Sequence, residues 1–215
     1  FHREARAASS FDHPHAIRVF DFGQADTREL FMVMELLRGR SLSEMIRDDA
    51  PVSVARAAKV GNEVAKALAA AHKVGIIHRD MKPDNVFLLN VEGDSDFVKV
   101  LDFGIAKFVS GTGDSSVTKT GLIVGTPHFM APEQAKPGTT LTPALDVYAL
   151  GVILYTLLTG KHPFEGETPL EALMAHLNEP VPDLPASVSA SSDFRSLVKR
   201  MLAKEPSSRP TAAEV

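Results

Sequence analysis

The chain has 215 residues, of which 44% are hydrophobic and 23% are charged, with a formal net charge of −4 at pH 7. This composition is typical of a globular protein with one domain or two small lobes, and the negative charge argues against a surface that coats nucleic acid. The absence of cysteine excludes disulfides and thiolate metal sites.

The first forty residues predict one helix and two strands. Residues 4–10 are rich in alanine and in charge, which indicates the end of a helix, and Pro14 prevents it from continuing. Alternating apolar residues predict strands at 17–22 and 30–36, joined by a turn at 23–26. This part is therefore rich in strands.

Helical spacing dominates after residue 39. Apolar residues recur at helical intervals at 42–46 and along 51–74, which predicts a short helix followed by a long one. Two short strands are predicted at 86–89 and 98–101. We interpret the acidic stretch between them, residues 90–97, as a turn that forms a surface insertion.

The last third of the chain is predicted to be helical, at residues 142–159, 169–177 and 193–202. The change of pattern along the chain predicts a strand-rich part, residues 1–37, and a mainly helical part, residues 38–215. We see no internal repeat that would indicate a repeat protein.

No signal peptide or membrane segment is predicted. The first residues are polar and lack an apolar run. The longest apolar stretch without charge, residues 147–160, is shorter than the roughly 20 residues that cross a bilayer. We therefore expect a cytoplasmic location, with missing flanking sequence as the only place for a membrane anchor.

Two short motifs carry most of the functional information. The run HRDMKPDN occupies residues 78–85, and Asp102 of a DFG triplet follows seventeen residues after Asn85. Five fixed positions in the first motif make a chance match on the order of one in ten thousand for a chain of this length. Taken singly, each Asp or Asn could cap a turn or a helix. Taken together, they closely resemble the catalytic motifs of eukaryotic-type Ser/Thr protein kinases of the bacterial branch.

The resemblance implies an α+β, two-lobe protein kinase fold and ATP-dependent phosphorylation of Ser/Thr hydroxyls on protein substrates in bacterial signalling. Asp80 would orient the hydroxyl and accept its proton, and Lys82 would place an ammonium beside the transferred phosphate. Asn85 and Asp102 would supply oxygen ligands to Mg²⁺, with Mn²⁺ as an alternative. Gly104 would let the backbone turn directly after the metal ligand.

The substrate class is also implied by the resemblance. Lys82 and the sequence GTPHFMAPE at 125–133 match Ser/Thr kinases rather than tyrosine kinases. In that family, the threonine at the position of Thr126 hydrogen-bonds near the catalytic aspartate and lysine. The alternative for Thr126 is a simple turn residue.

The irregular segment 102–133 matches the boundaries of a kinase activation segment. We expect phosphorylation at Thr118 or Thr120, in trans within a kinase homodimer. The Arg79 guanidinium would then pair with the phosphate and order the loop. The alternative is a solvated loop rich in Ser and Thr.

The segment 31–39 resembles the last strand of the small lobe running into the hinge that binds adenine. Met34 would be the gatekeeper, and backbone groups of Glu35 and Leu37 would meet the adenine edge. Phe87 would form the apolar floor of the site. A strand without any role in ligand binding is the alternative.

Five further residues are expected to have structural roles, three of them around the catalytic loop, residues 78–85, and two in the large lobe. The resemblance implies that His78 is a packed scaffold residue in contact with Phe103, and not a general base. It implies that Asp146 anchors the backbone of the catalytic loop from a buried helix, and that Glu133 and Arg209 form an ion pair.

The chain is expected to be a fragment. Glu4 matches the helix glutamate that pairs with an ATP-positioning lysine, although a solvated helix residue is the alternative. Only three residues precede Glu4, so the Gly-rich loop and that lysine have no counterpart here, and Val215 ends the chain inside the expected last helix. Residues 1–37 would be the remainder of the small lobe and 38–215 the large lobe. We expect low activity from this fragment alone; a non-catalytic kinase-like binding module or an inactive truncated kinase is the alternative.

Overall fold

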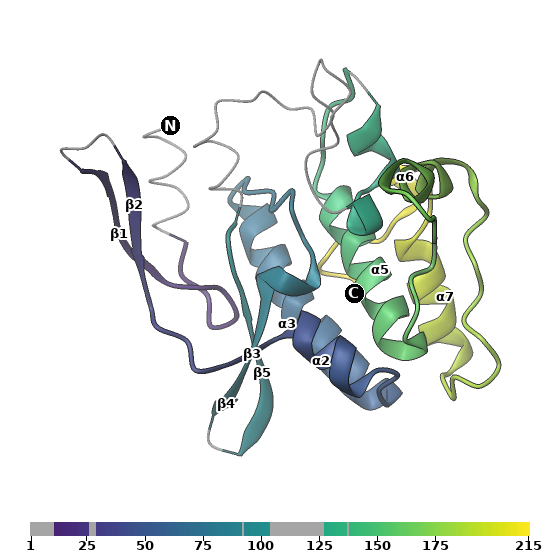
Figure 1. Cartoon of the computed structure of the whole chain (residues 1–215), viewed down its shortest axis with the longest axis horizontal. Helices are drawn as coiled ribbons and strands as arrows, with labels where there is room; N and C mark the ends of the chain where they lie inside the picture. The colour runs from purple at the N-terminus through teal and green to yellow at the C-terminus, as the bar shows by residue number, and fades with distance from the viewer. Residues whose placement is uncertain (1–10, 26–28, 92, 104–126, 137) are drawn as a thin grey trace.

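The computed structural model describes residues 11–25, 29–91, 93–103, 127–136 and 138–215 (Figure 1). These residues form two small antiparallel sheets and a group of helices, an α+β arrangement. The predicted helix end at 4–10 lies outside the described residues. So do five predicted site residues, which are Glu4, Gly104, Thr118, Thr120 and Thr126.

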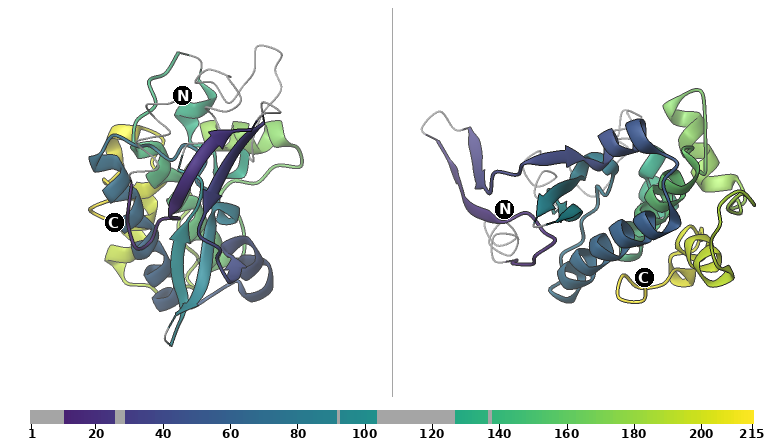
Figure 2. Two further views of the ribbon diagram at one scale, coloured as in Figure 1. Left: turned by 90° about the vertical axis from the view of Figure 1, so that its left-hand side faces the viewer. Right: turned by 90° about the horizontal axis from the view of Figure 1, so that it is seen from below.

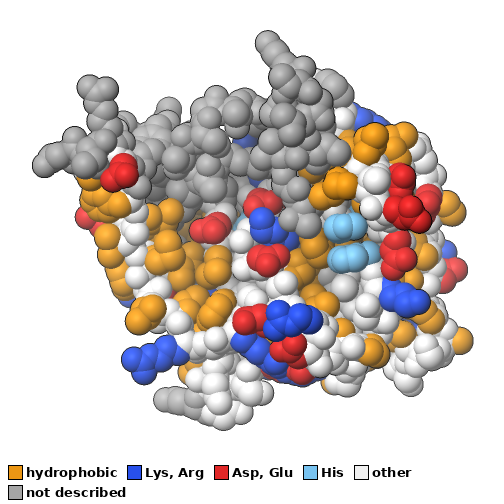
Figure 3. All heavy atoms as spheres, viewed as in Figure 1, with side chains coloured by type: hydrophobic (Ala, Val, Ile, Leu, Met, Phe, Trp, Pro, Cys, Tyr) orange, Lys and Arg blue, Asp and Glu red, His pale blue; other side chains and the backbone are white. Residues whose placement is uncertain are grey.

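The first sheet is a two-stranded ribbon of β1 (Val19–Gln24) and β2 (Leu30–Met34), which pair antiparallel from Val19–Met34 to Gln24–Leu30. Figures 1 and 2 show this ribbon at one end of the molecule, away from the large helices. Its apolar side chains are largely uncovered in the described part of the chain, with Phe20 60% and Phe31 47% exposed. Hydrophobic side chains accordingly gather at the left of the face in Figure 3.

The second sheet has the order β3–β4–β5, with β3 at Gly39–Ser41, β4 at Val86–Val91 and β5 at Asp94–Val100. The prediction that residues 90–97 form an acidic turn is wrong, because β4 and β5 pair as far as Val91–Asp94. The acidic residues are compatible with a strand because basic side chains of a neighbouring helix neutralise them. Arg56 donates two hydrogen bonds to the Asp96 carboxylate, at 2.7 and 2.8 Å.

The predicted helices are all present within the described residues that follow residue 39. Their bounds are α2 Leu42–Asp49, α3 Val54–Lys73, α5 Ala144–Thr159, α6 Pro169–Asn178 and α7 Ser192–Met201. Side-chain caps mark two of the helix starts, and the cap at Ser53 explains why α3 begins three residues after the predicted residue 51. The Ser53 hydroxyl accepts from the Arg56 N–H at the start of α3, and Ser41 and Glu44 form a capping box on α2.

Helix α5 is the centre of the helical part. It is buried on all sides from Leu145 to Leu158, which is why its sequence is apolar without periodicity. Helix α3 packs against it closely at Gly61, where an added Cβ would lie 2.8 Å from Leu154 Cδ2. Gly160 ends the helix with a left-handed conformation, at φ 72°. The buried first turn of α5 carries Asp146, which accepts hydrogen bonds from the loop at residues 78–85.

The helices carry no evidence of a membrane span. Among the residues that the structure describes, none of the helices has both the length and the apolar character that crossing a bilayer requires.

Candidate active site

The loop between α3 and β4 brings three predicted catalytic side chains together. The Lys82 ammonium lies 3.1 Å from the Asp80 carboxylate. The Asn85 side-chain amide donates to the Asp80 carbonyl at 2.8 Å and lies 3.4 Å from its carboxylate. The Asp80 side chain is 45% exposed and that of Lys82 is 23% exposed, so an incoming group can reach this pair.

The loop is held in a conformation that an isolated chain would avoid. Arg79 has a φ of 66° and Asp102 a φ of 50°. Left-handed backbone at residues other than glycine costs on the order of 1–3 kcal/mol and persists only where the surroundings impose it. Arg79 directly precedes Asp80, and Asp102 is itself a predicted metal ligand.

Asp146 imposes that conformation on the loop. Its carboxylate is fully buried in the first turn of α5 and accepts hydrogen bonds from the N–H groups of His78 and Arg79, both at 2.9 Å. It also lies 2.8 Å from Nε2 of His72 on α3. A buried carboxylate that accepts from consecutive amides forces both amides to point in one direction. The Arg79 carbonyl is held from another side by the side-chain amide of Gln134, at 3.0 Å.

His78 lies under the loop with both ring nitrogens in use. Its Nε2 is 2.7 Å from the Leu101 carbonyl, which can only accept, so Nε2 carries the proton. Its Nδ1 accepts from the Asp80 N–H at 3.3 Å. The ring is fully buried and its centroid is 5.1 Å from that of Phe103. Because both ring nitrogens are held in hydrogen bonds to the backbone, neither is left to transfer a proton.

Asp102 reaches the site from the end of β5. The Leu101 N–H donates to the Asn85 carbonyl at 2.8 Å, which ties the strand end to the catalytic loop. The next residue, Phe103, is buried between His78 and Phe11, with ring centroids 5.1 Å away on both sides. The Asp102 side chain itself is exposed.

The available donors fit a magnesium ion. Asn85 spends its amide nitrogen on the Asp80 carbonyl, which leaves its side-chain oxygen for a ligand, and Asp102 adds an exposed carboxylate. Mg²⁺ prefers hard oxygen donors and takes few protein ligands, with water and phosphate completing its shell. No cluster of three or more His, Cys, Asp or Glu side chains suited to a metal occurs in the described ranges. A site of one amide and one carboxylate suits Mg²⁺ better than a transition metal.

The residues predicted to meet adenine come from both sheets and from the segment that joins β2 to β3. Met34 ends β2 and is 40% exposed, while Phe87 on β4 is half-buried and pairs across the sheet with Lys99 of β5. Glu35 follows Met34, and its carboxylate is 2.7 Å from the Lys99 ammonium. Leu37 is half-buried in the segment that leads to β3.

Lys99, which contacts Glu35, is not among the predicted site residues. The signal was present, because a lysine stands between Val98 and Val100 in a strand of otherwise apolar character. A half-buried lysine in such a strand needs a partner, and the partner is 64 residues away.

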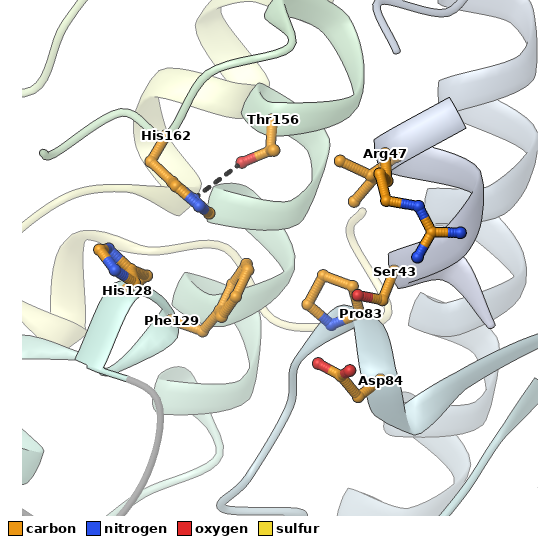
Figure 4. A pocket seen from close by; sticks show the side chains of 9 residues that line it. Ser43, Arg47, Pro83, Asp84, His128, Phe129, Thr156 and His162 are labelled. Carbon is orange, nitrogen blue, oxygen red and sulfur yellow. Dashed lines mark hydrogen bonds between the residues drawn. The ribbon is translucent and has the colours of Figure 1, made fainter. Parts of the chain in front are cut away.

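A pocket of roughly 310 Å³ opens beside the catalytic loop (Figure 4). It is lined by Ser43, Ile46, Arg47, Pro83, Asp84, His128, Phe129, Thr156 and His162. The rings of His128 and His162 stack with centroids 4.7 Å apart. Burial, first, and the neighbouring His128, second, lower the pKa of His162. Asp84 belongs to the same short turn as Asn85, so the pocket adjoins the catalytic loop. None of these residues was predicted to line a pocket, because they come from segments that are far apart in the sequence.

The predicted ion pair of Glu133 and Arg209 forms inside the helical part and joins two segments that are 76 residues apart in the sequence. The guanidinium meets the carboxylate in a two-pronged contact, at 2.6 and 2.8 Å. Both side chains are buried, and the Arg209 guanidinium also lies over the Tyr148 ring at 4.7 Å from its centroid.

Comparison with known proteins finds one family and relatives that carry its name. The family described as protein kinase domain matches residues 1–215. Serine/threonine-protein kinase pkn3 of Myxococcus xanthus is 43% identical over 218 residues, which cover 100% of this chain and 40% of that protein. Serine/threonine-protein kinase PknB of Mycolicibacterium smegmatis is 38% identical over 220 residues, which cover 100% of this chain and 34% of that protein.

A solved structure is also similar. Rad53 1-466 in complex with AMP-PNP superposes with a TM-score of 0.80 at 26% identity, over 99% of this chain and 52% of that chain. The chain thus spans between a third and two fifths of the length of these two bacterial relatives and about half of the Rad53 chain.

Proposed function

The chain belongs to the protein kinase domain family, and from this premise we propose that it forms the catalytic part of a bacterial Ser/Thr protein kinase used in signalling. The activity is transfer of the γ-phosphoryl group of ATP to Ser or Thr hydroxyls of protein substrates. The observation that supports this most strongly is the contact of Asp80, Lys82 and Asn85 in one strained loop.

The proposed reaction uses Asp80 and Lys82 directly. The substrate hydroxyl oxygen attacks the γ-phosphorus, the bond to the bridging oxygen of ADP breaks, and the hydroxyl proton passes to the Asp80 carboxylate. The Lys82 ammonium, 3.1 Å from that carboxylate, stabilises charge on the transferred phosphoryl oxygens. Asp80 is exposed enough to receive the hydroxyl, and Lys82 is near enough to act on the same group.

The proposed metal ligands are Asn85 and Asp102. Mg²⁺, with Mn²⁺ as an alternative, neutralises phosphate charge when it is bound. The tie between Leu101 and Asn85 keeps the two ligand-bearing segments together. Nucleotide binding is supported by the similarity to Rad53, whose structure was obtained in complex with AMP-PNP. We place the adenine edge at the backbone of Glu35 and Leu37, with Met34 as gatekeeper and Phe87 below the ring.

Protein substrates are proposed to lie along the pocket beside Asp84. The pocket adjoins the catalytic loop, so a side chain next to the phosphorylated residue can enter it while the hydroxyl reaches Asp80. Activation by phosphorylation in trans, within a homodimer and at Thr118 or Thr120, belongs to the same proposal. Arg79 is the proposed partner of the phosphate.

The proposed activity is tested with the complete gene product and ATP labelled at the γ-position. Autophosphorylation and transfer to a Ser/Thr-containing protein should occur, and Asp80→Asn should lower kcat by at least about a hundredfold, because the general base is lost. Asp183→Asn is a matched control, since it removes an exposed carboxylate from a surface ion pair with Lys199. Binding of ATP without any transfer would instead favour the non-catalytic module.

A further inference from the structure

We propose that the Lys99–Glu35 ion pair positions the backbone carbonyl of Glu35 to accept a hydrogen bond from the 6-amino group of adenine. The pair thereby sets a preference for nucleotides that carry this amino group. The inference rests on the proposed function, because it assumes that the segment after β2 receives the nucleotide base.

The backbone pairing at Glu35 is unusual. Residues opposite each other at a hydrogen-bonded position of an antiparallel pair normally exchange two bonds, each N–H donating to the other carbonyl. Arg18 and Glu35 exchange only one, in which the Glu35 N–H donates to the Arg18 carbonyl at 3.0 Å. The Arg18 N–H donates instead to the Glu35 carboxylate oxygen Oε1, at 2.8 Å. The carboxylate thus takes the place of its own backbone carbonyl.

Lys99 holds the carboxylate in this place. Its ammonium is 2.7 Å from the same Oε1 atom and 3.1 Å from the Ala16 carbonyl. The Lys99 side chain is 13% exposed and that of Glu35 is 26% exposed, so water screens the pair only partly. Lys99 is anchored in β5, whereas Glu35 follows β2, so the pair connects the two sheets.

The consequence is a carbonyl without a donor. Within the described part of the chain, no hydrogen bond is made to the backbone oxygen of Glu35. A backbone carbonyl is an obligatory acceptor that must find a donor when a ligand excludes water. An amino group satisfies it, whereas a purine that has oxygen at position 6 presents a second acceptor and is rejected.

The location of Lys99 connects this carbonyl to the rest of the proposed site. Lys99 pairs in register with Phe87, the proposed floor beneath the base, and stands three residues before Asp102. Lys99 therefore contacts the segment proposed to bind the base, and its own strand, β5, ends two residues before the proposed metal ligand Asp102.

The test is equilibrium binding of two nucleotides to the complete gene product. ATP is compared with purine riboside triphosphate, which lacks the 6-amino group. The wild-type protein should bind ATP about tenfold more tightly, the value of one good hydrogen bond. Lys99→Met should weaken ATP binding about tenfold and leave the analogue nearly unaffected, so that the preference falls towards one.

Two Glu35 variants separate positioning from a merely structural role. Glu35→Ala frees the Arg18 N–H to pair with the backbone carbonyl, so it should abolish the preference. Glu35→Gln keeps an oxygen for the Arg18 N–H and should retain part of it. Lys99→Arg, which preserves the ion pair, should restore most of the preference. Lys199→Met is the matched control, because it breaks an exposed ion pair elsewhere.

Several results would overturn the inference. A Lys99→Met protein that stays folded by circular dichroism and keeps the wild-type preference contradicts it, as does equal weakening of both nucleotides. If Lys99→Met does not fold, the Glu35→Ala and Glu35→Gln pair decides in the same way. Wild-type protein that prefers ATP but transfers no phosphate contradicts the proposed function and leaves this inference supported. Wild-type protein that binds neither nucleotide overturns both.

Discussion

Removing the Arg209 guanidinium should destabilise the helical part of the chain more than any change at the surface. Arg209 uses all five of its N–H groups. Two meet the Glu133 carboxylate at 2.6 and 2.8 Å, and three donate to backbone carbonyls at 2.7, 2.9 and 3.0 Å. The Arg209 side chain has no exposed area and that of Glu133 is 5% exposed. Arg209→Met would therefore leave a buried carboxylate without a partner.

The expected loss in free energy of unfolding is about 3–5 kcal/mol, the cost of removing one partner from a buried ion pair. Most of this loss comes from the isolated Glu133 carboxylate, because methionine fills a similar volume. The double variant Glu133→Leu/Arg209→Met should therefore be more stable than Arg209→Met alone.

Urea unfolding of the 215-residue chain, followed by circular dichroism, measures these differences. Lys199→Met is the control, since its partner Asp183 is 79% exposed and such a pair contributes less than about 1 kcal/mol. If Arg209→Met lost no more stability than Lys199→Met, the reasoning from burial would be refuted. If the double variant were no more stable than Arg209→Met alone, the explanation by an isolated Glu133 carboxylate would fail.

Three further changes test the scaffold. Asp146→Asn replaces one of two acceptor oxygens with a donor. We therefore expect the free energy of unfolding to fall by about 2–4 kcal/mol and hydrogen exchange at the His78 amide to become faster. Unchanged exchange at that amide would contradict the anchoring role of Asp146. Burial, and after it the charge of Lys204, lowers the pKa of His176 from its ordinary value near 6.5 to about 3. The unfolded chain therefore binds the proton first as pH falls, and stability should decline below about pH 6.5. His176→Gln should flatten this decline in urea unfolding between pH 7 and 5, and an identical slope in the variant would argue against it. Gly39→Ala places a Cβ 2.0 Å from the carbonyl oxygen of Leu88. The variant should therefore have a lower melting temperature, because β3 and β4 can no longer pair closely. A wild-type melting temperature would show that the two strands can separate at no cost.

Local sequence was sufficient for the helices. The spacing of apolar residues repeats within one or two turns, so it predicted α2 and α3 to within a few residues, and the caps at Ser41 and Ser53 fix their first residues. The same local reasoning failed for residues 90–97. Their acidity indicated a solvated turn, but the partner of Asp96 is Arg56, 40 residues earlier on another element.

The candidate site divides in the same way. Asp80, Lys82 and Asn85 lie within six consecutive residues, so the motif alone indicated that they act together. The contacts implied by family resemblance, such as that of Asp146 with His78 across 68 residues, could not be worked out from spacing. Their partners are distant in sequence and meet only when the helices pack.

The sequence by itself thus determined the kinase family, the helices and the chemical groups of the catalytic loop, because each depends on residues close together in the chain. Only the tertiary structure decided how the loop is held and which carboxylates are neutralised. It also revealed the ion pair of Lys99 with Glu35, which no periodicity predicts. The physical reason is that a buried charge is stable only beside its partner, and folding alone determines which distant residue that partner is.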